Sequence, residues 1–245
     1  MTQQAVDPAA DAYASLQFGR TAAPTAPIRH DLNARSSIDD HPVFAALDSE
    51  TRSLLLDGGC QTTLDIGDRL DLEDRVAFVQ EGVLGAFALS YQVCVGIVGT
   101  GGLLGLESAV CQSRPSSVVA LAECRLFEAP ARLLVDGLGR AKVTELSMRH
   151  SLARLHAMQA EAACNAAHLV PQRLAKWLLR LHRSNRAREI RLTQAELARL
   201  MGVQRTAING AARQLQDIGA VRCVRGRIII SDEARLLRAA CECAV

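Results

Sequence analysis

The stretch LTQAELARLMGVQRTAINGAARQLQDIGAVRCVRGRIIISD, residues 192–232, carries the clearest structural signals in the chain. Thr193 is a typical N-cap residue, and apolar residues at helical spacing follow it. Gly202 offers the left-handed backbone conformation that a tight turn between two helices needs. A second helix opens at Gln204 or Arg205. This order of signals predicts a helix-turn-helix.

The second of these helices has an apolar side and a polar side. Its inner side carries Ile208, Ala212 and Leu215. Its outer side carries Arg205, Thr206, Asn209 and Arg213. Arginine suits a bidentate contact to guanine, asparagine pairs with adenine or a phosphate, and threonine meets the thymine methyl group. We therefore predict that this helix enters the major groove of double-stranded DNA.

A basic hairpin follows the second helix. Gly219 ends the helix, and the segments VRCV and RIII flank Arg225 and Gly226, which predict a tight turn. Arginines at the tip of such a wing contact backbone phosphates. The complete set of predicted DNA-binding residues is Thr193, Gln194, Gln204, Arg205, Thr206, Asn209, Arg213, Arg225 and Arg227.

Charge is divided unevenly along the chain, although the formal net charge is only +2. Residues 1–165 hold 13 Lys+Arg against 20 Asp+Glu, a balance of −7, whereas residues 166–245 hold 15 against 6, a balance of +9. A basic module gains affinity for DNA by releasing counterions from the phosphates, and an acidic remainder limits indiscriminate binding. Composition alone fits a solvated basic surface as well as it fits a DNA-binding module. The helix-turn-helix motif therefore decides between these two interpretations.

Two helices are expected ahead of the motif. Residues 171–182 form an amphipathic helix whose basic residues lie largely on the side opposite to its apolar residues. These basic residues are Arg173, Lys176 and Arg180, and Arg183 follows directly after the helix on the same side. Residues 142–168 contain neither Pro nor Gly and predict one long helix.

The long helix carries a seam of residues at alternating spacings of four and three. The seam consists of Met148, Leu152, Leu155, Gln159, Ala162, Ala166 and Leu169. An adjacent stripe of small residues consists of Ala153, Ala157, Ala160, Cys164 and Ala167. Small residues permit close approach of a second helix, so the seam predicts a parallel helix pair and a homodimer. The alternative is that the helix packs on its own sensor domain.

The middle of the chain changes to short strands separated by turn residues. The strand-rich segments are residues 60–72, 75–90, 91–102 and 116–129, with two short helices before them and one at residues 131–139 after them. This pattern predicts an antiparallel jelly-roll barrel and an α+β fold class. We divide the chain into a flexible leader (1–40), a barrel (41–140), a dimerisation helix (141–169) and a winged helix-turn-helix (170–245).

The eight cysteines include no C-x-x-C pair. Most have apolar neighbours, so we expect reduced thiols packed in the core. Cys241 and Cys243 are the closest pair, but two thiolates cannot complete a structural zinc site unaided. We predict no metal site.

The chain has no uninterrupted apolar stretch of about 18 residues. Its first 20 residues have neither a basic start nor an apolar central region. We therefore expect a cytoplasmic protein without a membrane partner.

The order of strands, long helix, helix-turn-helix and wing resembles the Crp/Fnr family of bacterial transcription regulators over residues 41–243, most specifically in residues 192–232. The resemblance implies a cyclic-nucleotide-binding-like barrel, a homodimer on a palindromic operator and RNA polymerase as a further candidate partner. It also gives Arg205 the role of reading guanine. Thr206 and Gly210 stand where members that read the best-known half-site carry glutamate and arginine, so we expect a different half-site.

In that family a Gly-Glu pair and a following Arg-Ser or Arg-Thr bind a cyclic nucleotide. The matching residues here are Gly105, Glu107, Arg114, Ser116 and Ser117. Pro115 stands where the phosphate-binding arginine is expected, and on a strand a shift by one position reverses the direction of a side chain. We therefore expect an unknown small-molecule effector, or none, rather than a cyclic nucleotide. Glu107 and Arg114 would form a surface or structural pair.

No cofactor is predicted. The iron–sulfur clusters of this family need cysteines near the amino terminus, and residues 1–59 contain none. His150 and His156 leave haem open, although a lone histidine on a helix is usually a polar surface residue.

Two other function classes compete with this interpretation. The barrel could serve as a sensor or protein-interaction module in a protein with weak or architectural DNA binding. An enzyme is not predicted, because the chain contains no phosphate-binding loop followed by Lys and Ser/Thr, no H-E-x-x-H and no G-x-S-x-G.

Overall fold

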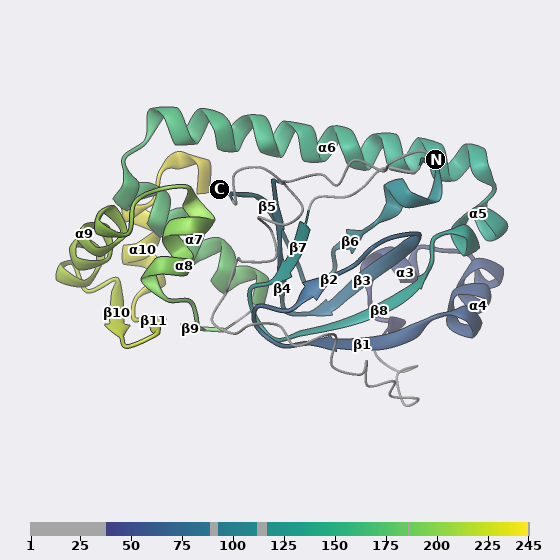
Figure 1. The fold of residues 1–245 in the computed structure, drawn as a ribbon, viewed down its shortest axis with the longest axis horizontal. Helices are drawn as coiled ribbons and strands as arrows, with labels where there is room; N and C mark the ends of the chain where they lie inside the picture. The colour runs from purple at the N-terminus through teal and green to yellow at the C-terminus, as the bar shows by residue number, and fades with distance from the viewer. Residues whose placement is uncertain (1–37, 89–92, 112–116, 186, 245) are drawn as a thin grey trace, which may run out of the picture.

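The computed structural model describes residues 38–88, 93–111, 117–185 and 187–244. A barrel of short strands occupies one part of the molecule and a helical domain with a small hairpin occupies the other (Figure 1). The long helix α6 runs past both parts along one edge of the molecule (Figure 1). This arrangement confirms the predicted α+β fold, with its barrel, long helix and carboxy-terminal helix-turn-helix.

The barrel consists of two four-stranded antiparallel sheets, in the orders β1-β8-β3-β6 and β2-β7-β4-β5. Their strands are β1 (Cys60–Leu64), β2 (Arg69–Leu70), β3 (Arg75–Glu81), β4 (Val83–Phe87), β5 (Cys94–Gly99), β6 (Leu103–Leu104), β7 (Ser117–Ala120) and β8 (Cys124–Pro130). A 3₁₀ turn, η1 (Leu106–Ala109), follows β6. All of the strand-rich segments predicted from the sequence contain strands.

Short helices close one end of the barrel. They are α3 (Pro42–Ala45), α4 (Ser49–Gly58) and α5 (Arg132–Leu138). Asp48 caps α4 by accepting a hydrogen bond from the Thr51 amide, as its position predicts. Ile38 is fully buried in the core cluster to which these three helices contribute. The folded domain therefore begins before residue 41, inside the segment predicted to be a leader. Residues 1–37 lie outside the described part of the chain.

The helical domain follows the long helix α6 (Arg140–Ala167). Its elements are α7 (Val170–Asn185), β9 (Glu189–Ile190), α8 (Gln194–Met201), α9 (Arg205–Asp217), β10 (Val221–Val224), β11 (Arg227–Ile230), α10 (Glu233–Ala239) and η2 (Glu242–Ala244). The strands β10, β11 and β9 form a small antiparallel sheet. None of the helices among the described residues is long and apolar enough to cross a membrane.

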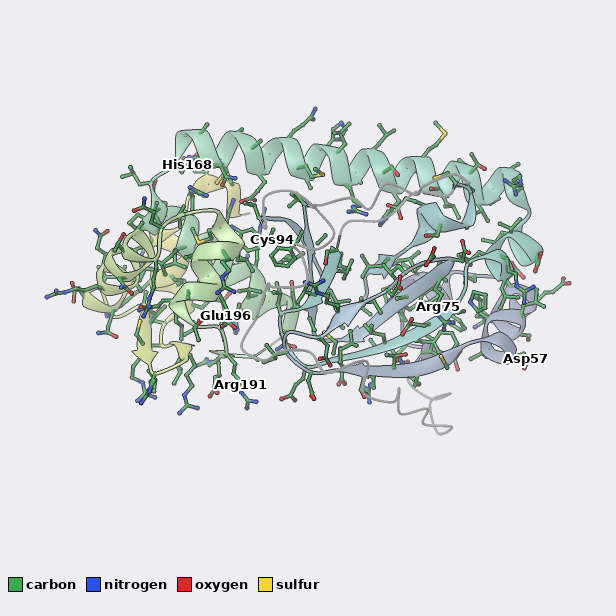
Figure 2. The ribbon with its side chains drawn as sticks, viewed as in Figure 1. Asp57, Arg75, Cys94, His168, Arg191 and Glu196 are labelled. Carbon is green, nitrogen blue, oxygen red and sulfur yellow. The ribbon has the colours of Figure 1, made fainter. Side chains whose placement is uncertain are left out.

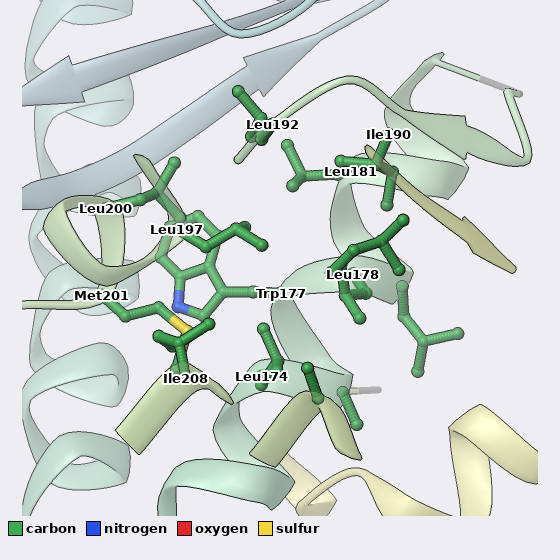
Figure 3. Close-up of a cluster of buried hydrophobic side chains, with 14 of the residues drawn as sticks. Leu174, Trp177, Leu178, Leu181, Ile190, Leu192, Leu197, Leu200, Met201 and Ile208 are labelled. Carbon is green, nitrogen blue, oxygen red and sulfur yellow. The ribbon is translucent and has the colours of Figure 1, made fainter. Parts of the chain in front are cut away.

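Trp177 of α7 lies at the centre of the helical domain (Figure 3). Leucines of α7 and α8 surround the indole, and Ile208 of α9 packs from the other side (Figure 3). The same cluster continues into the barrel through Phe87 of β4 and Cys94 of β5. The helix-turn-helix therefore packs directly on the barrel and shares a core with it.

The basic side of α7 differs from the prediction. Lys176 has no exposed surface and Arg173 is also buried, because α6 and the turn after α8 cover this side of the helix. The Lys176 ammonium contacts both carboxylate oxygens of Glu161 at 2.8 Å, and Arg173 donates to the Met201 carbonyl at 2.9 Å. A helical period reports which residues share a side, but it does not report what covers that side.

Candidate DNA-binding surface

The first helix of the motif, α8, starts where the sequence predicts. Thr193 accepts a hydrogen bond from the Glu196 amide at 3.2 Å, and the Glu196 carboxylate accepts one from the Thr193 amide at 2.6 Å. Two otherwise unpaired amide donors are satisfied by this reciprocal cap. Gln194 is the first residue of α8 and is partly buried. Thr193 and Gln194 thus lie at the amino-terminal end of a firmly capped helix.

Gly202 makes the turn between the two helices in the left-handed conformation, with φ of 65° and ψ of 38°. A Cβ at this position would lie 3.1 Å from a methyl group of Val93, which precedes β5. The turn is therefore held both by its backbone conformation and by its contact with the barrel. Gln204 is the N-cap of α9 and Arg205 its first residue.

The two sides of α9 are divided as predicted. Ile208, Ala212 and Leu215 are buried. The outer side consists of the exposed residues Arg205, Thr206, Asn209 and Arg213. Within the described part of the chain, neither Arg205 nor Arg213 belongs to an ion pair, so both guanidinium groups keep their charge available for an external anion.

Gly210 lies on the exposed side of α9 beside these residues. No heavy atom lies within 4 Å of the position where its Cβ would be. The protein itself therefore does not require glycine here. The missing side chain leaves the helix backbone open to close approach by a large partner such as a duplex.

The wing forms through the pairing of β10 and β11, with Gly226 in the left-handed conformation at its turn. Arg225 is exposed at the tip. Arg227, by contrast, contacts Glu189 of β9 at 3.1 Å, and Arg191 contacts the same carboxylate at 3.2 Å. The hydrogen bond from Arg227, followed by that from Arg191, holds the pKa of Glu189 below its usual value. Arg227 thus needs to share or leave this contact to reach a phosphate.

Of the predicted effector residues that the structure describes, Gly105 and Glu107 follow β6 and Ser117 begins β7. Gly105 precedes η1 with φ of 76°, and a Cβ there would collide with the Arg75 carbonyl oxygen. The fold itself therefore requires glycine at this position, with or without a ligand. Ser117 begins β7 opposite Phe87, whereas Arg114 and Ser116 lie outside the described residues.

Glu107, the residue that the resemblance places at the ribose of a nucleotide, contacts Arg154 of α6 at 2.9 Å. Glu107 is thus paired with the long helix. Arg114, which we named as its partner, lies outside the described residues, so a Glu107–Arg114 pair stays a prediction.

The predicted dimer seam is exposed. Met148 is 62% exposed, Leu152 52% and Leu155 48%, and Gln159 and Ala162 are exposed as well. The side of α6 that faces its own chain consists instead of Val143, Ser147, Glu161 and Cys164, which are buried. His156 is exposed, whereas His150 is half-buried, and burial lowers its pKa despite the opposing effect of Glu107.

A cavity of about 660 Å³ lies between the barrel and the helical domain. Its wall includes Gly82 and Leu121 of the barrel side and Leu181 of α7. An ion pair between Arg191 and Glu123 at 3.1 Å closes one edge. A second cavity of about 720 Å³ lies over the turn at Gly202. Neither cavity is lined by Gly105, Glu107 or Ser117, so these two hollows are separate from the predicted effector residues.

Sequence reasoning missed one cluster of chemically reactive residues. Cys164 and His168 at the end of α6 meet Cys241 and Cys243 near the carboxyl terminus. Burial and the neighbouring Cys164 thiol raise the pKa of Cys241. The C-x-x-x-H spacing on a helix could have signalled half of this cluster, but nothing local joins it to residues 241–243. Cys94 and Cys124 are buried as predicted, and Cys111 is exposed.

The helix-turn-helix is similar to a known domain family. Residues 172–239 match the family model of the Crp-like helix-turn-helix domain. A search of curated proteins gives no match.

Solved structures extend the similarity to the barrel. A transcriptional regulator of the Crp/Fnr family from Eubacterium rectale is 19% identical with a TM-score of 0.63, and the match covers 81% of this chain and 97% of the other. A Crp-family transcriptional regulator from Thermus thermophilus is 17% identical with a TM-score of 0.60, covering 73% and 96%. The c-di-GMP-responsive regulator CLP of Xanthomonas campestris is 18% identical with a TM-score of 0.57, covering 75% and 99%.

These matches cover both the helix-turn-helix and the barrel with its long helix, the two parts on which the resemblance predicted from the sequence depends. The exposed basic side of α9 lies in the matched domain, and the barrel and long helix lie in the matched fold. Residues 172–239 therefore form a Crp-like helix-turn-helix domain, and the chain as a whole shares the fold of solved regulators of the Crp/Fnr family.

Proposed function

We propose that the protein acts as a homodimer that binds a palindromic operator with sequence specificity. The observation that carries the proposal is the outer side of α9, where Arg205, Thr206, Asn209 and Arg213 are all exposed together. Two helices related by a two-fold axis would place these residues in successive major grooves. Arg225 of the wing would contact a phosphate and fix the orientation of the domain.

Dimerisation through α6 is supported by its exposed apolar seam. Large side chains such as Met148 and Leu152 are rarely left in water along one continuous helix side without a partner. A second copy of α6 would cover the seam on both chains at once. Leu152→Glu would place two carboxylates in that interface and is expected to give a monomer in sedimentation. The matched exposed substitution Arg149→Glu lies beside the seam and is expected to leave the dimer intact.

The proposed effector is a small molecule other than a typical cyclic nucleotide, unless DNA binding needs no effector at all. Pro115 in place of a phosphate-binding arginine supports this proposal. The engagement of Glu107 by Arg154 supports it as well, because a ribose hydroxyl would have to compete with a guanidinium group for that carboxylate. The proposed function is that of a binding protein rather than an enzyme. It works in the cytoplasm, where its DNA lies, and RNA polymerase is a further candidate partner.

The test is operator selection from random duplex DNA followed by binding with variants. Arg205→Ala is expected to weaken operator binding by about 1 to 3 kcal/mol and to relax the preference at one base pair of each half-site. Arg132→Ala removes the same charge on α5, at the end of the molecule away from α9 (Figure 1), and serves as the control.

Two outcomes would favour the alternative, a barrel-based interaction module with weak or architectural DNA binding. One is that selection recovers no palindromic motif. The other is that Arg205→Ala weakens binding to random DNA and to the selected sequence by the same factor.

A further inference from the structure

Four side chains that commonly bind metal ions meet at the junction of α6 and the carboxy-terminal segment. Cys164 and His168 come from the end of α6, and Cys241 and Cys243 come from the segment after α10. Their four ligand atoms all lie within 4.8 Å of one another. Figure 2 shows His168 at the end of the long helix, and Figure 1 shows the carboxy-terminal segment beneath that end.

The fold brings these residues together by two local devices. Cys164 and His168 are four residues apart and so lie on one side of the helix, with His168 as its C-cap. Beyond α10, Ala240 adopts an extended conformation, with φ of −74° and ψ of 158°, and the chain turns back toward α6. Cys241 is thereby buried against Cys164, although 77 positions separate them in the sequence.

Two of the distances between the ligand atoms are close to those around one tetrahedral ion. The two sulfur atoms of Cys164 and Cys241 are 3.6 Å apart, and Cys243 Sγ is 3.8 Å from His168 Nδ1. Zinc–sulfur bonds of about 2.3 Å and zinc–nitrogen bonds of about 2.0 Å give tetrahedral edges of about 3.5 Å between sulfur and nitrogen and about 3.8 Å between two sulfur atoms. A disulfide would need sulfur atoms about 2.0 Å apart, so Cys164 and Cys241 are not joined in that way.

The surroundings fit the charge of such a site. Three thiolates, one imidazole and a divalent ion carry a net charge of −1. The buried Lys176 ammonium lies 2.9 Å from Cys164 Sγ and would donate a hydrogen bond to that thiolate. Donors of this kind orient a metal-bound ligand and offset its charge.

We propose that Cys164, His168, Cys241 and Cys243 bind one Zn²⁺ ion in a closed Cys₃His site. Three thiolates and an imidazole are a ligand set of structural zinc, and ligand atoms this close together leave room for one ion but not for a cluster of several irons. The site extends beyond the DNA-binding function, because the ion would tie the carboxy-terminal segment to the point where α6 passes into α7. It would thereby stiffen the joint between the long helix and the helix-turn-helix domain.

The experiment is a titration of the full-length, reduced protein with Co²⁺ as a spectroscopic probe, followed by displacement with Zn²⁺. We expect one ion per chain, thiolate-to-cobalt charge-transfer bands and the intense d–d bands of tetrahedral Co²⁺. Cys243→Ser is expected to weaken binding more than about 100-fold and to alter these bands. Cys111→Ser, at an exposed cysteine outside the cluster, is the matched control and should bind like the unchanged protein.

A second measurement needs no variant. Alkylation with iodoacetamide, read by mass spectrometry, should modify Cys111 with and without Zn²⁺ but modify Cys243 only without it. Absence of stoichiometric binding would overturn the proposal. So would equal metal affinity of folded Cys243→Ser and Cys111→Ser proteins, or equal alkylation of Cys243 in both states. None of these readouts involves DNA, so they are independent of the proposed operator binding.

Discussion

Arg154 of α6 donates a hydrogen bond from Nη1 to Glu107 Oε1 at 2.9 Å, which joins the long helix to the turn after β6. Both side chains are only partly exposed, so water screens this ion pair less than a pair on an open surface. The barrel is thereby linked to the helix that bears the proposed dimer seam. A movement of the turn at η1 would act directly on α6 through this ion pair.

Arg154→Met tests this link. We expect the free energy of unfolding, measured by urea denaturation, to fall by about 1 kcal/mol, because Glu107 loses its charged partner in a partly buried position. Arg149→Met on the same helix is the control. Its side chain is 74% exposed and contacts Glu145 at 3.5 Å, so a change of less than about 0.5 kcal/mol is expected. Equal losses for the two variants would contradict the structural role of the Glu107 pair.

Lys176→Met should be far more damaging. Burial raises the pKa of Glu161, but the Lys176 ammonium and then Arg180 more than reverse this effect, and the pKa lies below its usual value. Removing Lys176 leaves a buried carboxylate that keeps Arg180 as its one partner among the described residues, and we expect a loss of about 3 to 5 kcal/mol in urea denaturation. A chelator present throughout excludes any contribution from bound metal.

The double variant Lys176→Met with Glu161→Met is the matched comparison. It removes the stranded charge together with its partner, so part of the lost stability should return. If the free energy of unfolding of the double variant were instead lower than that of Lys176→Met, the unpaired charge of Glu161 would not be the cause of the lost stability.

Two glycines of the helix-turn-helix should respond to alanine with opposite signs. Gly210→Ala adds a methyl group in open space in the middle of α9 and should raise the free energy of unfolding by up to about 1 kcal/mol. Gly202→Ala forces a Cβ into a left-handed conformation close to Val93 and should lower it by about 1 to 2 kcal/mol. Thermal and urea denaturation of both variants measure this contrast. Shifts of the same sign would contradict it.

Stability should decline as the pH falls below about 6.5. Burial lowers the pKa of His150 and of His41 in the folded chain, although Glu107 opposes this at His150 and the Gly102 carbonyl opposes it at His41. Between the ordinary pKa and the lowered one, the unfolded chain binds more protons, so the free energy of unfolding rises with pH in that window. His150→Gln should flatten this slope in urea denaturation at a series of pH values. An unchanged slope would mean that His150 is protonated equally in both states.

The start and the turn of the helix-turn-helix could be predicted because their causes are local. Thr193 caps α8 through a residue three positions away, and Gly202 makes its turn through its own backbone. The alternation of buried and exposed residues along α9 follows from a period of 3.6 residues. These features identify the helix-turn-helix and the side of α9 that is exposed.

The contacts between distant parts of the chain could not be predicted in the same way. Lys176 was assigned correctly to one side of α7, but its burial and its pairing with Glu161 follow from α6 lying over that side. Cys164 meets Cys241 because two separate elements end at the same place. Local sequence thus accounts for the helix-turn-helix and its outer side, whereas long-range packing selects which side chains become neighbours. The physical reason is that a repeating pattern records the face on which a residue lies and not the partner that covers it.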